Sequence, residues 1–223
     1  MKLSERLKSI SNMVDPCDCI CDIGADHAYI PIDLISRGIV KRAVASDVRK
    51  GPCEIARKNI NENNLADKIE IRMGDGFEKI GPGECDTAVI AGLGGYLMIK
   101  ILEDGGNIPR SMNQIVIQPQ NSRENIREYL YSNGYDILNE ALAYDEGKFY
   151  TVMSVKYTGV SSHREKIEFF IGKKLIENKD KHLKMYLDKE IKRLKRILKN
   201  TYREDCEWLL HEYEKIREGE ILK

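Results

Sequence analysis

Carboxylates in the loops that follow predicted strands are the residues of this sequence best suited to chemistry. The loop after the first strand carries Asp22 and Asp26 on either side of Gly24. A dinucleotide site would need the spacing G-x-G-x-x-G to seat a pyrophosphate, whereas two carboxylates would repel phosphate. The loop therefore favours a cationic ligand, and the sulfonium and ammonium groups of S-adenosylmethionine meet that requirement. The alternative is a plain tight turn.

Two later acids occupy positions from which a nucleoside can be held. Asp47 ends the second predicted strand, where one carboxylate can accept hydrogen bonds from both hydroxyls of a ribose. After the third strand, Asp75 can accept from an adenine amino group, and Gly76 and Phe77 follow it, with Phe77 offering an apolar wall. Either acid could instead serve only its own turn. Acids at three successive strand ends favour a shared site, because ligands of open α/β sheets bind beyond the carboxyl ends of the strands.

Glycines and amides follow the fourth and fifth predicted strands on the same rim. The fourth strand runs into Ala91, Gly92, Leu93, Gly94 and Gly95, and the fifth into Gln118, Pro119 and Gln120. Glycines leave room for a flat group, and side-chain amides can read the edge of a base. We expect Ala91 and Gly92 to contact the cofactor and the remaining glycines and the Gln-Pro-Gln segment to contact the substrate. The alternative is a packing turn with capping amides.

Three alternating cysteines, Cys17, Cys19 and Cys21, are expected on one face of the first strand. Tetrahedral zinc sites usually use C-x₂-C pairs, so this spacing favours packing, and we expect no metal. The longest weakly polar run, Ala88–Ile99, is shorter than the ~18 apolar residues that a membrane helix needs, and the N-terminal residues lack the apolar region of a signal peptide. We therefore expect a cytoplasmic protein with free thiols and no membrane segment.

The elements that must position these residues follow an alternating pattern. Short apolar, β-branched runs occur at Cys19–Ile23, Arg42–Ser46, Ile69–Met73, Thr87–Ala91 and Gln114–Ile117, with helix-like segments between them. Such alternation predicts parallel βαβ units. Two later runs, Tyr135–Ala143 and Lys148–Tyr157, are joined by Asp-Glu-Gly, which predicts an antiparallel hairpin at the edge of the sheet. The sequence thus predicts the α/β class, with a Rossmann-like, doubly wound sheet.

The zero formal charge of the chain hides an asymmetry. Lys and Arg number 36 against 36 Asp and Glu, yet residues 1–160 carry a net charge of −4 and residues 161–223 a net charge of +4. From Leu183 to Ile216, apolar residues recur every three or four positions on both sides of a turn near Asn200, which predicts a helical hairpin resembling a short coiled coil. We expect two domains, 1–160 with the ligand site and 161–223 with a basic surface for nucleic acid. A solvated coiled-coil face is the alternative.

These segments together resemble a known family. Residues 22–31, 46–52, 74–77, 91–95 and 118–120, followed by the basic hairpin, are similar to the bacterial tRNA (adenine-22-N1)-methyltransferases. The resemblance spans essentially the whole chain. It implies a Rossmann-like domain that binds S-adenosylmethionine, a coiled-coil domain that helps to hold tRNA, and methyl transfer to N1 of adenine 22 in the D-arm.

The reaction that this resemblance implies is a direct displacement, in which N1 attacks the sulfonium methyl group. Asp26 would stabilise the charge that develops on the adenine ring and accept its proton, with His27 orienting Asp26 or contacting RNA. Tyr29, in the same block, would lie beside the substrate. In the basic hairpin, Lys192, Arg193 and Arg196 would contact phosphates.

Rival functions stay open at this point. A methyltransferase could act on another RNA position or on a small molecule, and a non-catalytic RNA-binding scaffold could retain the same sheet. The missing glycines and the acid at Asp26 count against a dinucleotide-dependent oxidoreductase. We expect a monomer or a weak dimer.

Overall fold

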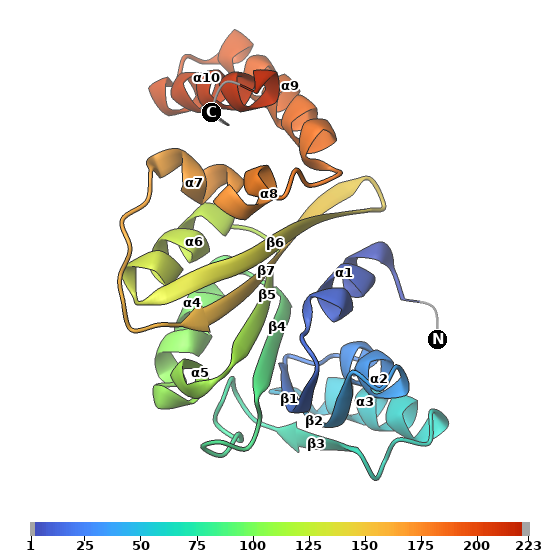
Figure 1. Ribbon diagram of the computed structural model, residues 1–223. Coiled ribbons are helices and arrows are strands. Elements are labelled where there is room, and N and C mark those ends of the chain that lie inside the picture. The colour runs from blue at the N-terminus through green and yellow to red at the C-terminus, as the bar shows by residue number, and fades with distance from the viewer. Residues whose placement is uncertain (1–2, 220–223) are drawn as a thin grey trace.

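The computed structural model describes residues 3–219 and contains a seven-stranded sheet (Figure 1). The strands are β1 (Cys17–Ile23), β2 (Val40–Asp47), β3 (Ile69–Met73), β4 (Thr87–Leu93), β5 (Gln114–Pro119), β6 (Tyr135–Asp145) and β7 (Lys148–Tyr157). Their order in the sheet is β3-β2-β1-β4-β5-β7-β6. The first five run parallel, and β7 pairs antiparallel with both β5 and β6. The predicted Rossmann-like sheet with an antiparallel edge is confirmed.

Helices cover both faces of this sheet. One face carries α1 (Glu5–Met13), α2 (Tyr29–Ser36) and α3 (Lys50–Glu62), and the other carries α4 (Gly95–Asp104), α5 (Asn107–Ser111) and α6 (Arg123–Ser132) (Figure 1). Because successive side chains of a strand point to opposite faces, β1 serves two cores. Ile20 packs in the core under α1, α2 and α3, whereas Cys19 and Cys21 pack in the core under α4 and α6.

The cysteine prediction holds for two of its three residues. Cys19 and Cys21 are buried side by side in one core, and Cys19 Sγ lies 3.3 Å from Cys85 Sγ. The placement of Cys17 on the same face is wrong, because this residue is only partly buried and packs against the opposite core. Cys17 is the first residue of β1, at the point where the chain arrives from α1.

The edge hairpin turns at Glu146 and Gly147. Both residues have positive φ, 46° and 79°, as a two-residue turn of type I′ requires. The tip of this hairpin touches the N-terminal helix, since the backbone N–H of Arg6 donates to Asp145 Oδ2 with an N···O distance of 3.2 Å. Helix α1 was not predicted from the sequence, and this contact gives it a fixed place on the sheet.

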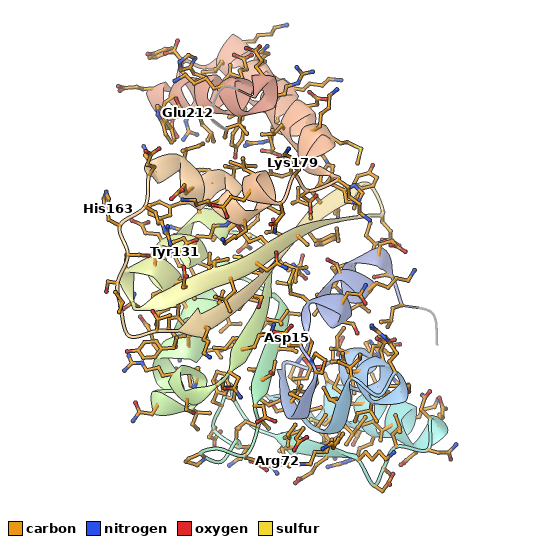
Figure 2. All side chains as sticks on the ribbon, viewed as in Figure 1. Asp15, Arg72, Tyr131, His163, Lys179 and Glu212 are labelled. Carbon is orange, nitrogen blue, oxygen red and sulfur yellow. The ribbon has the colours of Figure 1, made fainter. Side chains whose placement is uncertain are left out.

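The C-terminal part is helical, as predicted. It comprises α7 (Lys166–Ile171), α8 (Lys173–Glu177), α9 (Leu183–Asn200) and α10 (Glu204–Glu218). Apolar residues of all four helices form a third core with Leu142 of β6. The turn before α9, marked by Lys179 in Figure 2, rests on β6, where the backbone N–H of Leu142 donates to Asp180 Oδ2 at 3.0 Å. Within residues 3–219, no helix combines the length and apolar character needed to cross a bilayer.

Candidate functional site

A pocket of about 300 Å³ lies beyond the carboxyl ends of β1, β2 and β4. It brings together many of the residues predicted for the site: Asp22, Gly24, Asp26, His27, Tyr29, Asp47, Ala91, Gly92 and Gln120. These residues come from strand ends and from the loop before α2. The parallel sheet therefore gathers them on one rim, as open α/β sheets do with their ligand sites.

The loop between β1 and α2 is fixed by its backbone. Gly24 has φ of 76°, a conformation that costs little for glycine and more for other residues. The N–H groups of Gly24 and Ala25 both donate to the carbonyl oxygen of Ser46 at the end of β2, at 2.8 and 2.9 Å. Ala28 has φ of 54° where α2 begins. The backbone between the two strands is thus held in one conformation, from which the side chains of the loop reach the pocket.

Asp22 places a buried carboxylate in the pocket. Its side chain is 6% exposed, and burial raises its pKa to about 7. Burial disfavours the charged form of a carboxyl, and no cation among residues 3–219 offsets this effect at Asp22. A cationic ligand beside Asp22 would lower this pKa and restore the charge of the carboxylate.

Arg49 ties together two other acids of the pocket. Asp47 Oδ1 accepts from the backbone N–H of Arg49 at 2.8 Å and from its Nε at 3.3 Å. Arg49 Nη2 also lies 3.9 Å from Asp26 Oδ1. Asp47 is buried, whereas the side chain of Asp26 is 55% exposed. The first carboxylate is therefore held in place at the end of β2, and the second remains open to a substrate.

His27 lies between Asp26 and an aromatic neighbour. Its ring stacks on Tyr29 with centroids 4.9 Å apart and an interplanar angle of 7°. Its Nε2 is 3.4 Å from Asp26 Oδ2. Its carbonyl oxygen accepts from Asn59 Nδ2 at 2.9 Å, which fastens the loop to α3. Nδ1 is buried and has no hydrogen-bond partner among the residues described. The imidazole is thus positioned by stacking and by its backbone.

The ends of β4 and β5 form the wall next to this loop. Gly92 has φ of 76°, and the pairing of the two strands shifts register between Ala91 and Leu93. The backbone N–H of Gln120 donates to the carbonyl oxygen of Leu93 at 2.8 Å. At Gly95 a Cβ atom would lie 2.8 Å from the carbonyl oxygen of Ser122, so only glycine allows the two backbones to approach. The glycines at the end of β4 are therefore compatible both with close packing of the backbone and with an open rim that admits a ligand.

Several predicted contacts are not placed as expected. Gln118 is fully buried, and its amide is engaged with Arg6 and with the carbonyl oxygen of Pro119 rather than directed to an open surface. Pro119 and Gly95 are buried as well. Asp75, Gly76 and Phe77 line a separate pocket of about 260 Å³ beside α4. Phe77 is only 3% exposed and packs in the core, so it offers no open wall.

The comparison with known protein families covers nearly the whole chain. The model of the TrmK family, tRNA (adenine(22)-N(1))-methyltransferase, matches residues 20–218. The chain belongs to this family. The matched stretch begins in β1 and ends in α10, so it includes the strand ends that form the pocket and the basic helical hairpin.

Relatives in sequence and in structure agree with the family match. The tRNA (adenine(22)-N(1))-methyltransferase of Bacillus subtilis is 34% identical over 153 residues, which are 69% of this chain and 64% of that protein. A Streptococcus pneumoniae structure in complex with S-adenosyl-L-methionine has a TM-score of 0.89 at 27% sequence identity. The alignment covers 97% of this chain and 100% of that chain. Mycoplasma capricolum TrmK, solved with S-adenosyl-homocysteine, has a TM-score of 0.81 at 28% identity, with 98% of each chain covered.

Arg6 and Arg49 line the pocket of this family member, and neither was predicted from the sequence. Arg49 lies two residues after Asp47, and the nearby Asp47 carboxylate was the only local feature of the sequence that could have pointed to Arg49. Arg6 belongs to α1. Two features of the sequence are typical of a helix here: Ser4 at the N-cap, and the apolar residues Leu7 and Ile10, which are three positions apart. A helix could have been predicted from these signals. The direction of the Arg6 side chain depends on contacts that are distant in sequence.

The basic residues predicted to bind RNA lie apart from the pocket. Lys192, Arg193 and Arg196 are exposed on α9, and Arg193 Nε is 2.8 Å from Glu190 Oε2. In Figure 1, α9 and α10 lie together at the end of the molecule away from β1, β2 and β3. Lys189 of α9 donates from Nζ to the carbonyl oxygen of Gly147 at 2.8 Å, so α9 contacts the tip of the edge hairpin. Gly94, at the N-cap of α4, lies between β4 and α4 and is partly exposed.

Proposed function

We propose that this chain transfers a methyl group from S-adenosylmethionine to N1 of adenine 22 of tRNA, at the pocket beyond β1, β2 and β4. The family match over residues 20–218 carries the proposal, because every predicted pocket residue from Asp22 to Gln120 lies within the matched stretch. Solved relatives of this fold hold S-adenosyl-L-methionine or S-adenosyl-homocysteine.

The residues of the pocket suit this cofactor. Asp22 is a carboxylate whose charge burial disfavours, so a ligand with a sulfonium and an ammonium group would stabilise it. Asp47, held by Arg49, is at the position from which a ribose diol is bound. Asp75 remains our candidate for the adenine amino group of the cofactor, with Gly76 beside it, and Gly24, Ala91 and Gly92 leave room for the ligand. When bound, S-adenosylmethionine supplies an electrophilic methyl group.

Asp26 is the group that we assign to the substrate adenine. Methylation at N1 makes the ring cationic, and a nearby carboxylate stabilises that charge and accepts the proton shed from N6. Arg49 and His27 each lie within 4 Å of one oxygen of Asp26 and hold it in place. His27 and Tyr29 form a stacked surface on which a base could rest. Displacement at a sulfonium methyl group requires no nucleophilic side chain, so alignment of the two reactants supplies much of the catalysis.

We assign the binding of tRNA to the second proposed domain, residues 161–223. The N1 edge of a paired or stacked adenine is covered, so the base must be swung out at a cost on the order of a few kcal/mol. Phosphate contacts by Lys192, Arg193 and Arg196 would offset this cost. Gln120 lines the pocket. We assign Gly94, at the N-cap of α4, to the side from which the base would enter. We propose an enzyme that is a monomer or a weak dimer and works on tRNA in the cytoplasm, and we assign no metal to the reaction.

Product analysis tests the proposed function. The protein is incubated with S-adenosylmethionine and total tRNA, and the tRNA is then digested to nucleosides and separated by mass spectrometry. N1-methyladenosine is the expected product. A methylated guanosine, a methylated exocyclic nitrogen or no methylated nucleoside would each contradict the proposal.

A further inference from the structure

A groove of about 580 Å³ lies along another face of α1, outside the pocket beyond β1, β2 and β4. It is lined by α1, by residues 139–144 of β6 and by residues 178–182, the turn that leads into α9. Helix α1 is a wall of both cavities, because Arg6 and Leu7 line the pocket whereas Lys8 and Asn12 line the groove. An RNA strand with one base in the pocket could therefore reach the groove by crossing a single helix.

The groove also adjoins α9. His182, at the N-cap of α9, lines the groove, and Lys189 of α9 donates from Nζ to the carbonyl oxygen of Gly147 at the hairpin tip. Asp145 of the same hairpin accepts from the backbone N–H of Arg6 in α1. Helix α1, the hairpin tip and the start of α9 thus meet on one side of the molecule (Figure 1). The groove lies between the two surfaces that we assign to tRNA, the pocket and α9.

Two lysines of the groove keep their charge available for an anion. The acids that line the groove have partners within the protein: Glu5 pairs with Lys8, Glu140 pairs with Arg127, and Asp180 accepts from the backbone N–H groups of Leu142 and His182. Lys179 and Lys181 are exposed and form no ion pair within residues 3–219. Lys179 also has φ of 49°, a conformation that favours glycine or asparagine, so the backbone alone does not account for a lysine there.

An aromatic surface lies at the hairpin end of the groove. Tyr144 lines the groove and is 40% exposed. Its ring centroid lies 4.8 Å from that of Phe149 and 6.4 Å from that of His182. Phe149 packs edge-on against the buried ring of Tyr186 in α9, with centroids 5.5 Å apart. Tyr144 is therefore held by aromatic neighbours while part of its ring stays open. Proteins that bind unpaired nucleotides combine such rings, which stack on bases, with cations that hold the phosphates.

We propose that the groove binds the tRNA strand between the pocket and α9, with Lys179 and Lys181 on phosphates and Tyr144 stacked on an unpaired base. The inference rests on the proposed function, in which one adenine must leave its stack to enter the pocket. A base next to that adenine loses a stacking partner, and an aromatic ring beside α1 replaces it. An acidic peptide would use the two lysines but would leave the ring of Tyr144 without a base to stack on.

Fluorescence anisotropy with a labelled, unmodified tRNA transcript tests the two lysines. We expect the double variant Lys179→Gln with Lys181→Gln to bind tRNA about 10- to 100-fold more weakly at about 0.1 M salt, the effect of losing two phosphate contacts. The slope of log affinity against log salt should become shallower by about 1.5 to 2. The matched control is Lys68→Gln with Lys156→Gln, which removes two exposed lysines outside the groove and should change neither quantity. Affinity for S-adenosylmethionine should be the same in every variant.

Two variants without a change of charge test the aromatic contact. Tyr144→Leu removes the ring and keeps an apolar side chain beside Phe149, so tRNA binding should weaken about tenfold, the scale of one stacked base. Tyr144→Phe keeps the ring and should bind tRNA as wild type does. The salt slope should stay that of wild type in both variants.

Wild-type affinity and slope in the double lysine variant, or equal affinities of Tyr144→Leu and Tyr144→Phe, would overturn the assignment of the groove. These outcomes are separable from a failure of the proposed function. If the wild-type protein methylates adenine 22 and the groove variants bind tRNA normally, only the groove assignment is wrong. If the wild-type protein methylates no tRNA, the proposed function is wrong, and the groove assignment with it.

Discussion

Asp22 is the residue whose protonation sets the charge of the pocket. Because burial raises its pKa to about 7, the carboxyl is neutral at lower pH and ionised above it. A cationic ligand favours the ionised form. Affinity for S-adenosylmethionine should therefore fall as the pH decreases below 7, by up to about tenfold for each pH unit. Calorimetry between pH 5.5 and 7 measures this, in a range where the amine of the ligand stays protonated.

The variant Asp22→Asn provides the control for this pH dependence. It removes the titrating group with little change in shape, so its affinity should be lower than that of wild type at pH 7 and nearly constant between pH 5.5 and 7. A wild-type affinity that does not change with pH, or a variant that retains the wild-type profile, would show that another group controls cofactor binding.

Asp26 should affect the chemical step more than cofactor binding. Its side chain is 55% exposed and points into the pocket beside His27, so it can reach a substrate base. We expect Asp26→Asn to lower the single-turnover rate of methyl transfer about 100-fold, the scale of general-base catalysis, with an unchanged affinity for S-adenosylmethionine. Asp67→Asn, an exposed acid outside the pocket, is the control. Full single-turnover activity of Asp26→Asn would contradict the role assigned to this residue.

The sequence predicted acidic residues of the site better than it predicted their surroundings. Asp22, Asp26 and Asp47 could be placed on one rim because strand ends are readable from apolar runs. The roles of Gln118 and Phe77 could not be read, since an amide or an aromatic ring after a strand has the same local signal whether it faces a ligand or the core. The side-chain direction of Gln118 is decided by Arg6, 112 residues away in sequence.

At the scale of elements, alternating strands and helices were the strongest signal. The five parallel strands and the edge hairpin form where their apolar runs predicted, because buried strands of a parallel sheet carry continuous apolar residues. Helix α1 was missed although its Ser4 cap and apolar spacing were present. Its place against β5, β6 and β7 follows from tertiary contacts such as that between Arg6 and Asp145.

Helix α9 should carry affinity for RNA that is independent of the cofactor. Charge reversal of Lys192, Arg193 and Arg196 to Glu should weaken tRNA binding and make the slope of log affinity against log salt shallower by about two to three, if each residue neutralises one phosphate. Affinity for S-adenosylmethionine should not change, because these residues lie outside the pocket. Fluorescence anisotropy with labelled tRNA at several salt concentrations measures both quantities.

Charge reversal of three basic residues in and just after α3 provides the matched control for the α9 variant. Arg57 and Lys58 of α3 and Lys68 after it are exposed basic residues, and α3 lies at the opposite end of the molecule from α9 (Figure 1). Their replacement by Glu changes the net charge of the protein by the same amount. If both triple variants weakened tRNA binding equally, net charge would account for the effect, and α9 would be a solvated helical face.

At the scale of the whole molecule, a buried ion pair fastens the C-terminal helices to the sheet. Arg127 of α6 and Glu140 of β6 are almost fully buried, with Nε and Oε1 2.8 Å apart. Arg127 Nη1 also donates to the carbonyl oxygen of Phe169 in α7 at 2.8 Å. At Gly172, between α7 and α8, any Cβ atom would collide with the Glu140 carboxylate. The position of the basic hairpin relative to the pocket thus depends on this pair.

Breaking the pair from one side should destabilise the protein strongly. Arg127→Met leaves the Glu140 carboxylate buried without a partner, which costs about 3–5 kcal/mol. The double variant Arg127→Met with Glu140→Gln removes that charge and should recover part of the loss. Chemical denaturation followed by circular dichroism measures the free energy of unfolding, and Lys100→Met, in an exposed pair with Asp104, should change it little. A single variant as stable as wild type would show that the pair does not fasten the two parts.

The balance of 36 basic and 36 acidic residues reflects two separate surfaces of one molecule. Acids gather at the pocket on the sheet, and exposed cations gather on α9. Our central claim is that these surfaces act together on one atom, N1 of adenine 22. A methyl group at N1 blocks the Watson–Crick edge of adenine, so reverse transcriptase stops beside the modified base.

Primer extension on an unmodified tRNA transcript tests this claim most directly. The transcript carries adenine at position 22, and a matched transcript carries guanine there. With wild-type protein and S-adenosylmethionine, we predict a stop beside position 22 of the adenine transcript and none on the guanine transcript or without the cofactor. A stop at another position, or equal methyl incorporation into both transcripts, would contradict the account.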